Sequence, residues 1–426
     1  MFRPNLFRSL VLLTIASVSS VALSQQPRGN WQLPGVRIPR SQYQAPIVDY
    51  YNGQTPQLWD EQQPVERLMG DLAQRSWLRI DYLHWSFAGP GNVDIGAPVV
   101  IDNPSADLVV FDIDRAESAG VSLIPNMGNV ALDDTSGIRG TWGLDLANAQ
   151  LELEFFGTEQ NHDGFQFTDL ATGRDAMVAP VTEGTASRPN IVTPLLTNGA
   201  VQNADSANFL VYDNGFQTTL TSQMWGAEAS LLTNPYVPGP GVTWQWLGGF
   251  RYLVYEEEFR NRGINTRGQP LATAVNTRIT SIGASTVNNM YGPEVGARIS
   301  AEHRWFTFSA TPRVAFTIND YTGQTFSTVP TEATPAPAES RFSGSDIEFT
   351  PIVQVSFTGE LHVTPNFSIF GGYDLMWIYR MTRPYDNIDY DSTPGLTGGV
   401  VPNINQEIDL ESFYARGLSV GCVWQY

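Results

Sequence analysis

The residues best suited to chemistry in this chain are carboxylates and arginines that share one face of a series of alternating segments. In a β-strand, successive side chains point to opposite sides, so such a segment has one polar and one apolar face. Asp346 and Glu348, for example, alternate with Ile347 and Phe349. Charged groups inside a closed sheet would either line an ion passage or pair with one another and fill the interior, and we leave both open. The candidate lining residues are Arg139, Asp145, Glu152, Glu154, Glu228, Arg251, Glu294, Arg298, Arg313, Asp346, Glu348, Glu360 and Asp374.

Catalytic chemistry has weaker support. Gly417, Ser419 and Gly421 match the Gly-x-Ser-x-Gly spacing of a hydrolase nucleophile, but that motif needs a sharp strand-to-helix turn. Here the alternation continues through the motif, so small inward side chains explain it better. The chain has 4 histidines, and none shows a zinc-ligand spacing. We therefore expect no enzyme activity, no catalytic residue, no metal and no cofactor.

The net charge of the chain limits the kinds of molecule that can bind to it. It has 24 basic residues, all arginine, against 43 acidic residues, and its formal net charge is −19. Such a surface repels nucleic acid and attracts cations, so we expect no nucleic-acid partner. Cys422 is the single cysteine, which excludes an intramolecular disulfide.

The elements that would position the charged residues are long strands from residue 76 onward. Alternation runs for about 10–16 residues at a time, whereas strands of globular sheets most often have about 5–6. Tilted membrane-spanning strands need about 9–11. The connections also alternate between short ones (147–148, 233–242, 302–303, 362–366) and long ones (89–135, 159–216, 260–288, 319–345, 381–408). Membrane barrels sort their loops in this way, with short periplasmic turns and long external loops.

These features predict an all-β fold: a transmembrane, antiparallel, up-and-down β-barrel of about ten strands. Twelve is the alternative, if 107–115 and 119–124 add a hairpin to the barrel. The first strand changes its apolar parity between Tyr82 and Leu83, which predicts a bulge or a bent end. Aromatic residues near the strand ends would lie at the lipid interface: Trp77, Trp142, Trp244, Trp246, Trp305, Trp377, Tyr379, Trp424 and Tyr426.

The N-terminal part has a different character. Residues 1–24 combine Arg3 and Arg8 with an apolar stretch and small residues before Gln25, as a signal peptide does. Residues 25–75 read as a Gln/Pro-rich periplasmic linker with a short amphipathic helix at its end. The barrel is expected over 76–426.

The strands also resemble a known family, the planctomycete putative outer-membrane β-barrel porins. The segments that carry the resemblance are YLHWSFAGPG (82–91), WGLDL (142–146), LELEFFG (151–157), LGGFRYLVYEEEF (247–259), MYGPEVGARI (290–299), FGGYDLMWIYRMTRP (370–384) and YARGLSVG (414–421). The resemblance implies an outer-membrane location and a pore, and it assigns no catalytic or ligand residue.

We therefore expect a passive, narrow outer-membrane pore with a weak preference for cations. The alternative is a non-conducting structural or surface-binding barrel that acts through its long external loops. Expected partners are the lipid bilayer of the outer membrane, the outer-membrane assembly machinery, which would read the aromatic final strand, and small ions or solutes. A soluble secreted β-sandwich is a third hypothesis, and it predicts solubility without detergent.

Overall fold

The computed structural model describes residues 70, 72–98, 109–112, 119–167, 190–196, 208–212, 215–265, 278–331, 334–394 and 400–425. The expected signal peptide, most of the expected linker and Tyr426 lie outside these residues. Of the amphipathic helix expected over 64–75, only residues 70 and 72–75 are described; residues 70 and 72–74 are helical, and residue 75 is in a turn.

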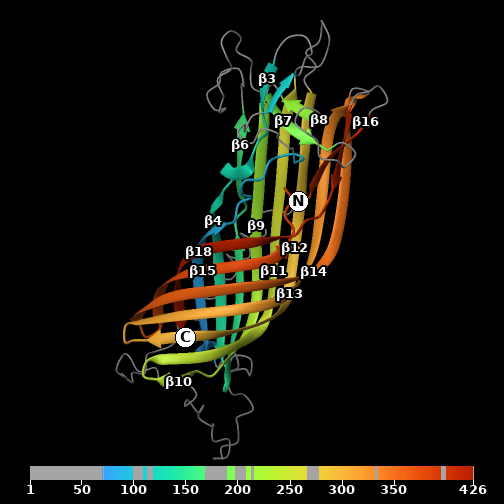
Figure 1. The fold of residues 1–426 in the computed structure, drawn as a ribbon. Coiled ribbons are helices and arrows are strands. Elements are labelled where there is room, and N and C mark those ends of the chain that lie inside the picture. The colour runs from blue at the N-terminus through green and yellow to red at the C-terminus, as the bar shows by residue number, and fades with distance from the viewer. Residues whose placement is uncertain are drawn as a thin grey trace, which may run out of the picture. The chain divides into compact units, whose positions relative to one another are not determined.

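Ten antiparallel strands close into a barrel, as the sequence predicted (Figure 1). Each strand pairs with its neighbour in chain order, and the pairing of β1 with β18 closes the ring. The ten strands are β1 (Ser76–Phe87), β4 (Leu132–Asp145), β5 (Ala149–Thr158), β9 (Gly215–Thr233), β11 (Val242–Asn265), β12 (Arg278–Glu302), β13 (Phe306–Thr331), β14 (Thr334–Thr364), β15 (Phe367–Met381) and β18 (Glu411–Gln425).

The remaining strands belong to the connections. Strand β10 (Tyr236–Gly239) forms a hairpin with β11, and β6 (Asn161–Phe167) pairs with the outer half of β9. A separate sheet contains β2 (Val109–Asp112), β3 (Ala119–Leu123), β7 (Asn190–Leu195) and β8 (Asn208–Tyr212), and β16 (Ile388–Pro394) pairs with β17 (Val400–Gln406). A one-turn 3-10 helix, η2, covers Met127–Asn129. The hairpin expected at 107–124 thus exists as β2–β3, but it is not in the barrel, and the twelve-strand alternative is wrong.

Two of the expected long loops are mostly strand. The ranges 260–288 and 319–345 fall largely within β11, β12, β13 and β14, which run far beyond the length that a bilayer requires. The short turns lie at the opposite end of the barrel. The two-residue turn after Leu146 is confirmed by its N–H bond to the Ala149 carbonyl, 2.9 Å. The two-residue turn expected at 302–303 lies instead at 304–305, because Glu302 pairs with Thr307 and the His303 N–H donates to the Phe306 carbonyl at 2.8 Å.

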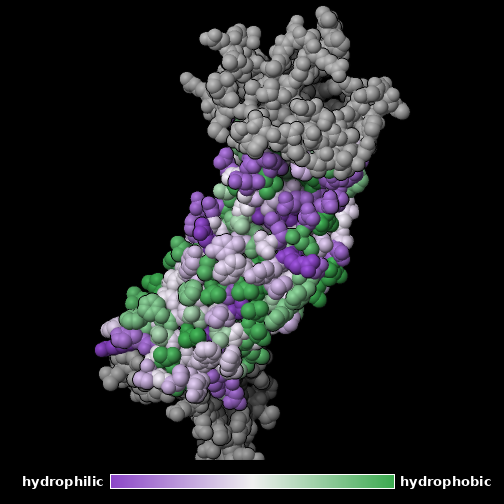
Figure 2. Space-filling view, in the orientation of Figure 1, coloured by the Kyte–Doolittle hydropathy of each residue, from purple (hydrophilic) through white to green (hydrophobic). Residues whose placement is uncertain are grey.

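The outer surface of the barrel has two zones. On β11 the outward residues from Trp244 to Val254 are apolar, and those from Glu256 to Arg262 are charged. Ten residue steps of about 3.4 Å, tilted by about 40°, span about 26 Å, which matches the apolar band of about 25 Å in membrane barrels. Figure 2 shows this division: hydrophobic side chains gather on the lower part of the visible face and hydrophilic ones on the upper part. The apolar zone is therefore the surface that lipid contacts.

Among the described residues, no helix is both long enough and apolar enough to cross a membrane.

The first strand has no bulge at the Tyr82–Leu83 parity change, and the two zones explain the misleading pattern. From Trp77 to Trp85 each residue pairs in unbroken register with β4, and the register shifts only between Trp85 and Phe87. Tyr82 faces outward with 52% exposure, and Leu83 faces inward and is fully buried. The apolar face changes sides because the strand leaves the lipid zone: beyond Tyr82 the outward face meets water and the inward face packs a core.

Candidate functional site: the barrel interior and its plug

Nine of the thirteen predicted lining residues meet in one layer inside the lipid zone. Arg139 donates to Asp81 at 2.7 Å and to Asp374 at 3.1 Å, and all three side chains are at most 6% exposed. Arg79 adds a second contact to Asp81, at 3.3 Å. We call this set of residues the ion-paired layer; its other predicted members are Glu152, Glu154, Glu228, Arg251, Glu294, Arg298 and Arg313.

A second group of ion pairs lies next to the first. Arg251 contacts Glu228 at 2.6 Å and Glu294 at 3.2 Å, and Arg313 contacts the other oxygen of Glu228. Each of the two carboxylates is at most 4% exposed. Because these charges are buried, they are tolerable only as pairs, and an unpaired one would be costly.

Three of the ion pairs bridge the interior instead of following the wall. Arg139 on β4 reaches Asp374 on β15, and Arg298 on β12 reaches Glu152 on β5 with two bonds of 2.7 Å each. The Arg313–Glu228 pair joins β13 to β9. In the ring of ten strands each of these pairs joins strands three positions apart. The layer therefore closes the lumen with side chains, which agrees with a barrel only slightly wider than the eight-stranded type that side chains just fill.

The other four predicted lining residues lie away from the ion-paired layer. Asp145 and Glu360 are on the inward face nearer the short turns, where Glu360 lies 3.4 Å from His362. Asp346 and Glu348 share the inward parity of β14, but they lie at the outer end of the lipid zone. There Glu348 pairs with the exposed Arg380 at 3.0 Å. The structure thus separates these residues into three levels along the barrel axis.

An apolar layer lies on the outer side of the ion pairs. The ring centroids of Phe87 and Tyr255 are 5.9 Å apart, those of Tyr255 and Phe413 are 4.7 Å apart, and those of Trp85 and Phe156 are 5.6 Å apart. These rings are at most 4% exposed. A hydrated ion that passed the ion-paired layer would meet this layer next, and transfer of a charge into it is strongly unfavourable.

The connection that follows β15 folds into the outer mouth of the barrel. Residues 381–390, which we call the plug segment, are almost all buried: Thr382 and Asn387 are fully buried and Arg383 is 1% exposed. Connections normally run over the surface because their backbone groups need partners. The plug segment finds those partners on the inner wall.

Arg383 is the first anchor of the plug segment. Its guanidinium donates to both oxygens of Glu257 on β11, at 2.8 and 2.5 Å, and to the Ala88 carbonyl after β1 at 2.9 Å. It also lies over the rings of Tyr385 and Phe413. Burial lowers the pKa of Arg383, but the adjacent Glu257 carboxylate outweighs burial and holds that pKa well above its ordinary value. Arg383 therefore stays charged, and it joins the plug segment to opposite sides of the mouth.

Asn288 is the second anchor. Its amide donates to the Thr382 carbonyl at 2.9 Å and accepts from the Thr382 N–H at 3.1 Å, so it pairs with the plug backbone as a strand would. Asn319 donates to the same Asn288 oxygen at 2.9 Å. Inside the plug segment, Asn387 donates to the Thr382 hydroxyl at 2.7 Å and accepts from the Asp409 N–H at 3.1 Å. The buried polar groups of the plug segment are thus largely satisfied.

Most of the predicted interface aromatics lie on the outer surface. Trp246, Trp305, Tyr379 and Trp424 are between 43% and 62% exposed. Trp142, Trp244 and Trp377 are partly exposed on the outward parity of their strands. Trp77 is the exception: it pairs with Gly143, and its ring occupies the space that a side chain at Gly143 would take on the inner wall. Because the inner wall faces the lumen, the Trp77 ring points into the lumen, and its predicted place at the lipid interface is wrong. Tyr426 lies outside the described residues.

Sequence reasoning missed Asp81, Glu257 and the whole plug segment. Asp81 has the inward parity of β1, so a strict alternation test would have found it. Nothing in the local pattern distinguishes the plug segment from an external loop, because its partners are more than 90 residues away in the chain. No group of three or more potential metal-binding side chains occurs within the described part of the chain.

Comparisons with known proteins agree with this architecture. The family model described as "Putative beta barrel porin-7 (BBP7)" matches residues 77–426. No curated protein sequence matches the chain.

Several solved outer-membrane proteins are similar in structure. The outer membrane protease OmpT from Escherichia coli has 10% sequence identity and a TM-score of 0.43, and the match covers 83% of this chain and 97% of that chain. A Pseudomonas aeruginosa FadL homologue has 8% identity and a TM-score of 0.25, with 82% and 90% covered. The Pseudomonas putida toluene transporter TodX has 6% identity and a TM-score of 0.21, with 82% and 88% covered. Such low scores carry no argument about what this chain binds or transports.

Proposed function

This chain belongs to the family described as Putative beta barrel porin-7 (BBP7), a family of outer-membrane β-barrels, and on that premise we propose that it is a narrow pore held closed by its own plug segment. The observation that carries the proposal is the burial of residues 381–390 in the outer mouth, anchored by Arg383 on Glu257. Release of this segment would admit water to the apolar layer and the ion-paired layer behind it, and both layers would then rearrange and open the passage.

We propose a weak preference for cations, as the sequence predicted. The ion-paired layer contains six carboxylates (Asp81, Glu152, Glu154, Glu228, Glu294, Asp374) and five guanidiniums (Arg79, Arg139, Arg251, Arg298, Arg313). Rings of carboxylates favour cations, but here most of the charge is neutralised locally, so the selectivity should be slight. Asp145 and Glu360 add two further carboxylates to the inward face, nearer the short turns.

Conductance in a planar bilayer tests the plug. Wild-type protein should be almost silent, and Arg383→Ala should open the barrel frequently, because it leaves the buried Glu257 without its charged partner and with only the Tyr255 hydroxyl, at 2.8 Å. Arg380→Ala is the matched control: it removes an arginine three residues away whose side chain is 60% exposed. It should behave as wild type. A silent R383A protein, shown to be folded and inserted, would refute the plug proposal.

That result would favour the second candidate, a non-conducting barrel that binds partners at the cell surface. The observation in its favour is the length of β11, β12, β13 and β14. These strands extend well beyond the lipid zone and form a wall there. Binding that depends on this wall, in a protein without conductance, would support it.

Three further expectations are proposals as well. We propose that the chain has no catalytic activity, since His362 is engaged by Thr307 and Ser368 inside the wall. We propose that the outer-membrane assembly machinery recognises β18, whose outward residues Leu418, Val420 and Trp424 are exposed. A planctomycete origin, which the family resemblance implied, remains a prediction.

A further inference from the structure

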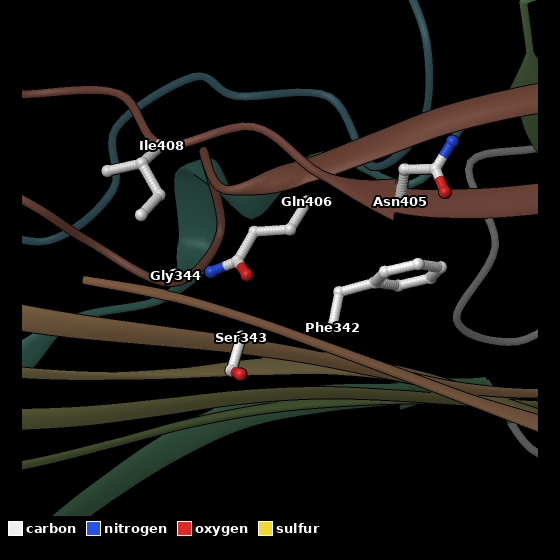
Figure 3. Close-up of a pocket in the computed structure, with 6 residues that line it drawn as sticks. All are labelled: Phe342, Ser343, Gly344, Asn405, Gln406 and Ile408. Atoms are coloured by element: carbon white, nitrogen blue, oxygen red, sulfur yellow. The ribbon is translucent and has the colours of Figure 1, made fainter.

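A small cavity opens on the inner face of the strand wall, beyond the lipid zone. It has a volume of about 370 Å³ and lies between β14 and the residues at the end of β17. Figure 3 shows Phe342 and Gln406 entering it from opposite sides, with the Gln406 amide beside Gly344 and Ile408 at one end. The remaining lining residues are Ser343, Gly344 and Asn405. This volume is at the lower end of the range for ligand pockets, about 300–1,000 Å³, so it suits a small ligand.

The edge of β14 is open at this cavity. The register of β14 with β15 covers only Ile352–Thr364, so around Phe342 and Gly344 the one strand paired with β14, among those described, is β13. Backbone N–H and C=O groups on such an edge are available to a ligand. Phe342 is 39% exposed here, beyond the lipid that would explain an exposed aromatic ring.

Gln406 supplies a polar group without a partner. Its Nε2 atom is buried and makes no hydrogen bond within the described part of the chain. Gly323 and Gly344 face each other on β13 and β14, and a Cβ at Gly323 would lie 2.5 Å from that nitrogen. The amide therefore occupies a space that only glycine leaves free. A buried amide donor without an acceptor is uncommon, and a ligand oxygen would satisfy it.

Charge limits the class of ligand. None of the six lining residues is charged. Asp346 and Glu407 lie two residues and one residue away along their segments, and the chain has a net charge of −19. An anionic ligand would be repelled. An aromatic ring beside an amide and an open strand edge suits a molecule with one apolar face and several hydroxyl groups.

We propose that this cavity is a binding site for a small uncharged sugar of monosaccharide size. One C–H face of the sugar ring stacks on Phe342, and a hydroxyl oxygen accepts from the Gln406 amide. The site does not depend on conduction through the barrel, so its test is independent of the plug proposal.

The test is saturation-transfer NMR on the detergent-solubilised full chain, with glucose, N-acetylglucosamine and glucuronate as probes. The two neutral sugars should receive saturation and compete with each other, and glucuronate should not. Gln406→Leu keeps the bulk of the side chain and removes the amide, so it should weaken binding about two- to tenfold, the effect of one neutral hydrogen bond. Phe342→Ala should weaken it at least as much.

The matched control is Gln324→Leu, the same substitution on the exposed, outward face of β13 beside Gly323. It should leave binding unchanged. Wild-type protein that binds neither neutral sugar would overturn the proposal, as would preferred binding of glucuronate. Equal loss of binding in Q406L and Q324L would also overturn it, because the amide would then have no specific role.

Discussion

Replacement of Arg139 by methionine tests whether the ion-paired layer stabilises the barrel only as a complete set. Arg139 bridges Asp81 and Asp374, whose side chains are 0% and 4% exposed. Methionine fills a similar volume but leaves both carboxylates without this partner. Asp81 keeps Arg79 at 3.3 Å, and Asp374 keeps the Ser356 hydroxyl at 2.6 Å.

The magnitude follows from what is left behind. Removal of one partner from a buried ion pair typically costs about 3–5 kcal/mol, and replacement of the whole pair by neutral groups is often nearly neutral. Because each carboxylate keeps one contact, we expect Arg139→Met to lower the free energy of unfolding by about 3 kcal/mol. The triple variant R139M/D81N/D374N should recover most of that loss. Arg380→Met, at an exposed ion pair, should cost at most about 1 kcal/mol.

The assay is urea unfolding of the protein in lipid vesicles, followed by tryptophan emission; the chain has 11 tryptophans. Two results would refute the reasoning. One is a loss below about 1 kcal/mol for R139M, which would mean that water already solvates the layer. The other is a triple variant that is no more stable than the single one, which would mean that packing, not unpaired charge, sets the cost.

Two other predictions concern the outer mouth and the wall. Burial, and secondarily the Glu411 carboxylate, raises the pKa of Asp386 from 3.8 to about 6. As the pH falls, the folded state therefore takes up a proton at a higher pH than the unfolded state does. The free energy of unfolding should consequently rise as the pH falls from about 6 toward 4. In thermal melts Asp386→Asn should flatten this rise, and an unchanged slope would contradict the assignment. A Cβ at Gly417 would lie 1.9 Å from the Trp85 ring, whereas Gly140 has nothing within 4 Å. Gly417→Ala should cost about 1–3 kcal/mol in urea unfolding and Gly140→Ala much less, and equal costs would contradict the packing of Trp85.

The ten-stranded barrel could be predicted from the sequence because the lipid zone imposes a simple rule. Phe357 and Leu361 are 48% and 53% exposed, and Gln354 on the other parity is 4% exposed. Within that zone, the apolar residues of the alternating pattern face lipid and the polar residues face the lumen. Beyond it the rule inverts, since Glu258 faces water and Phe259 faces the core. Strand ends read with one fixed rule were therefore mistaken for loops.

The interior could be predicted only in part. Parity identified Arg139, Arg251 and Arg313 as inward, because a strand offers only two directions. Which carboxylate each arginine meets depends on the curvature of the closed ring, and the alternation carries no information about it. The plug segment is a stronger example. Arg383 and Glu257 are 126 residues apart, and local sequence cannot show that a connection turns inward instead of outward.

The central claim is that the Arg383–Glu257 pair holds the barrel closed, and a double-mutant cycle in single-channel recordings tests it most directly. The measurement is the opening frequency of R383A, Glu257→Ala and the double variant, each compared with wild type. If the pair is the lock, each single variant opens frequently, and the double variant opens no more often than either, because both changes remove the same interaction. Single variants as silent as wild type, or frequencies that multiply in the double variant, would contradict the account.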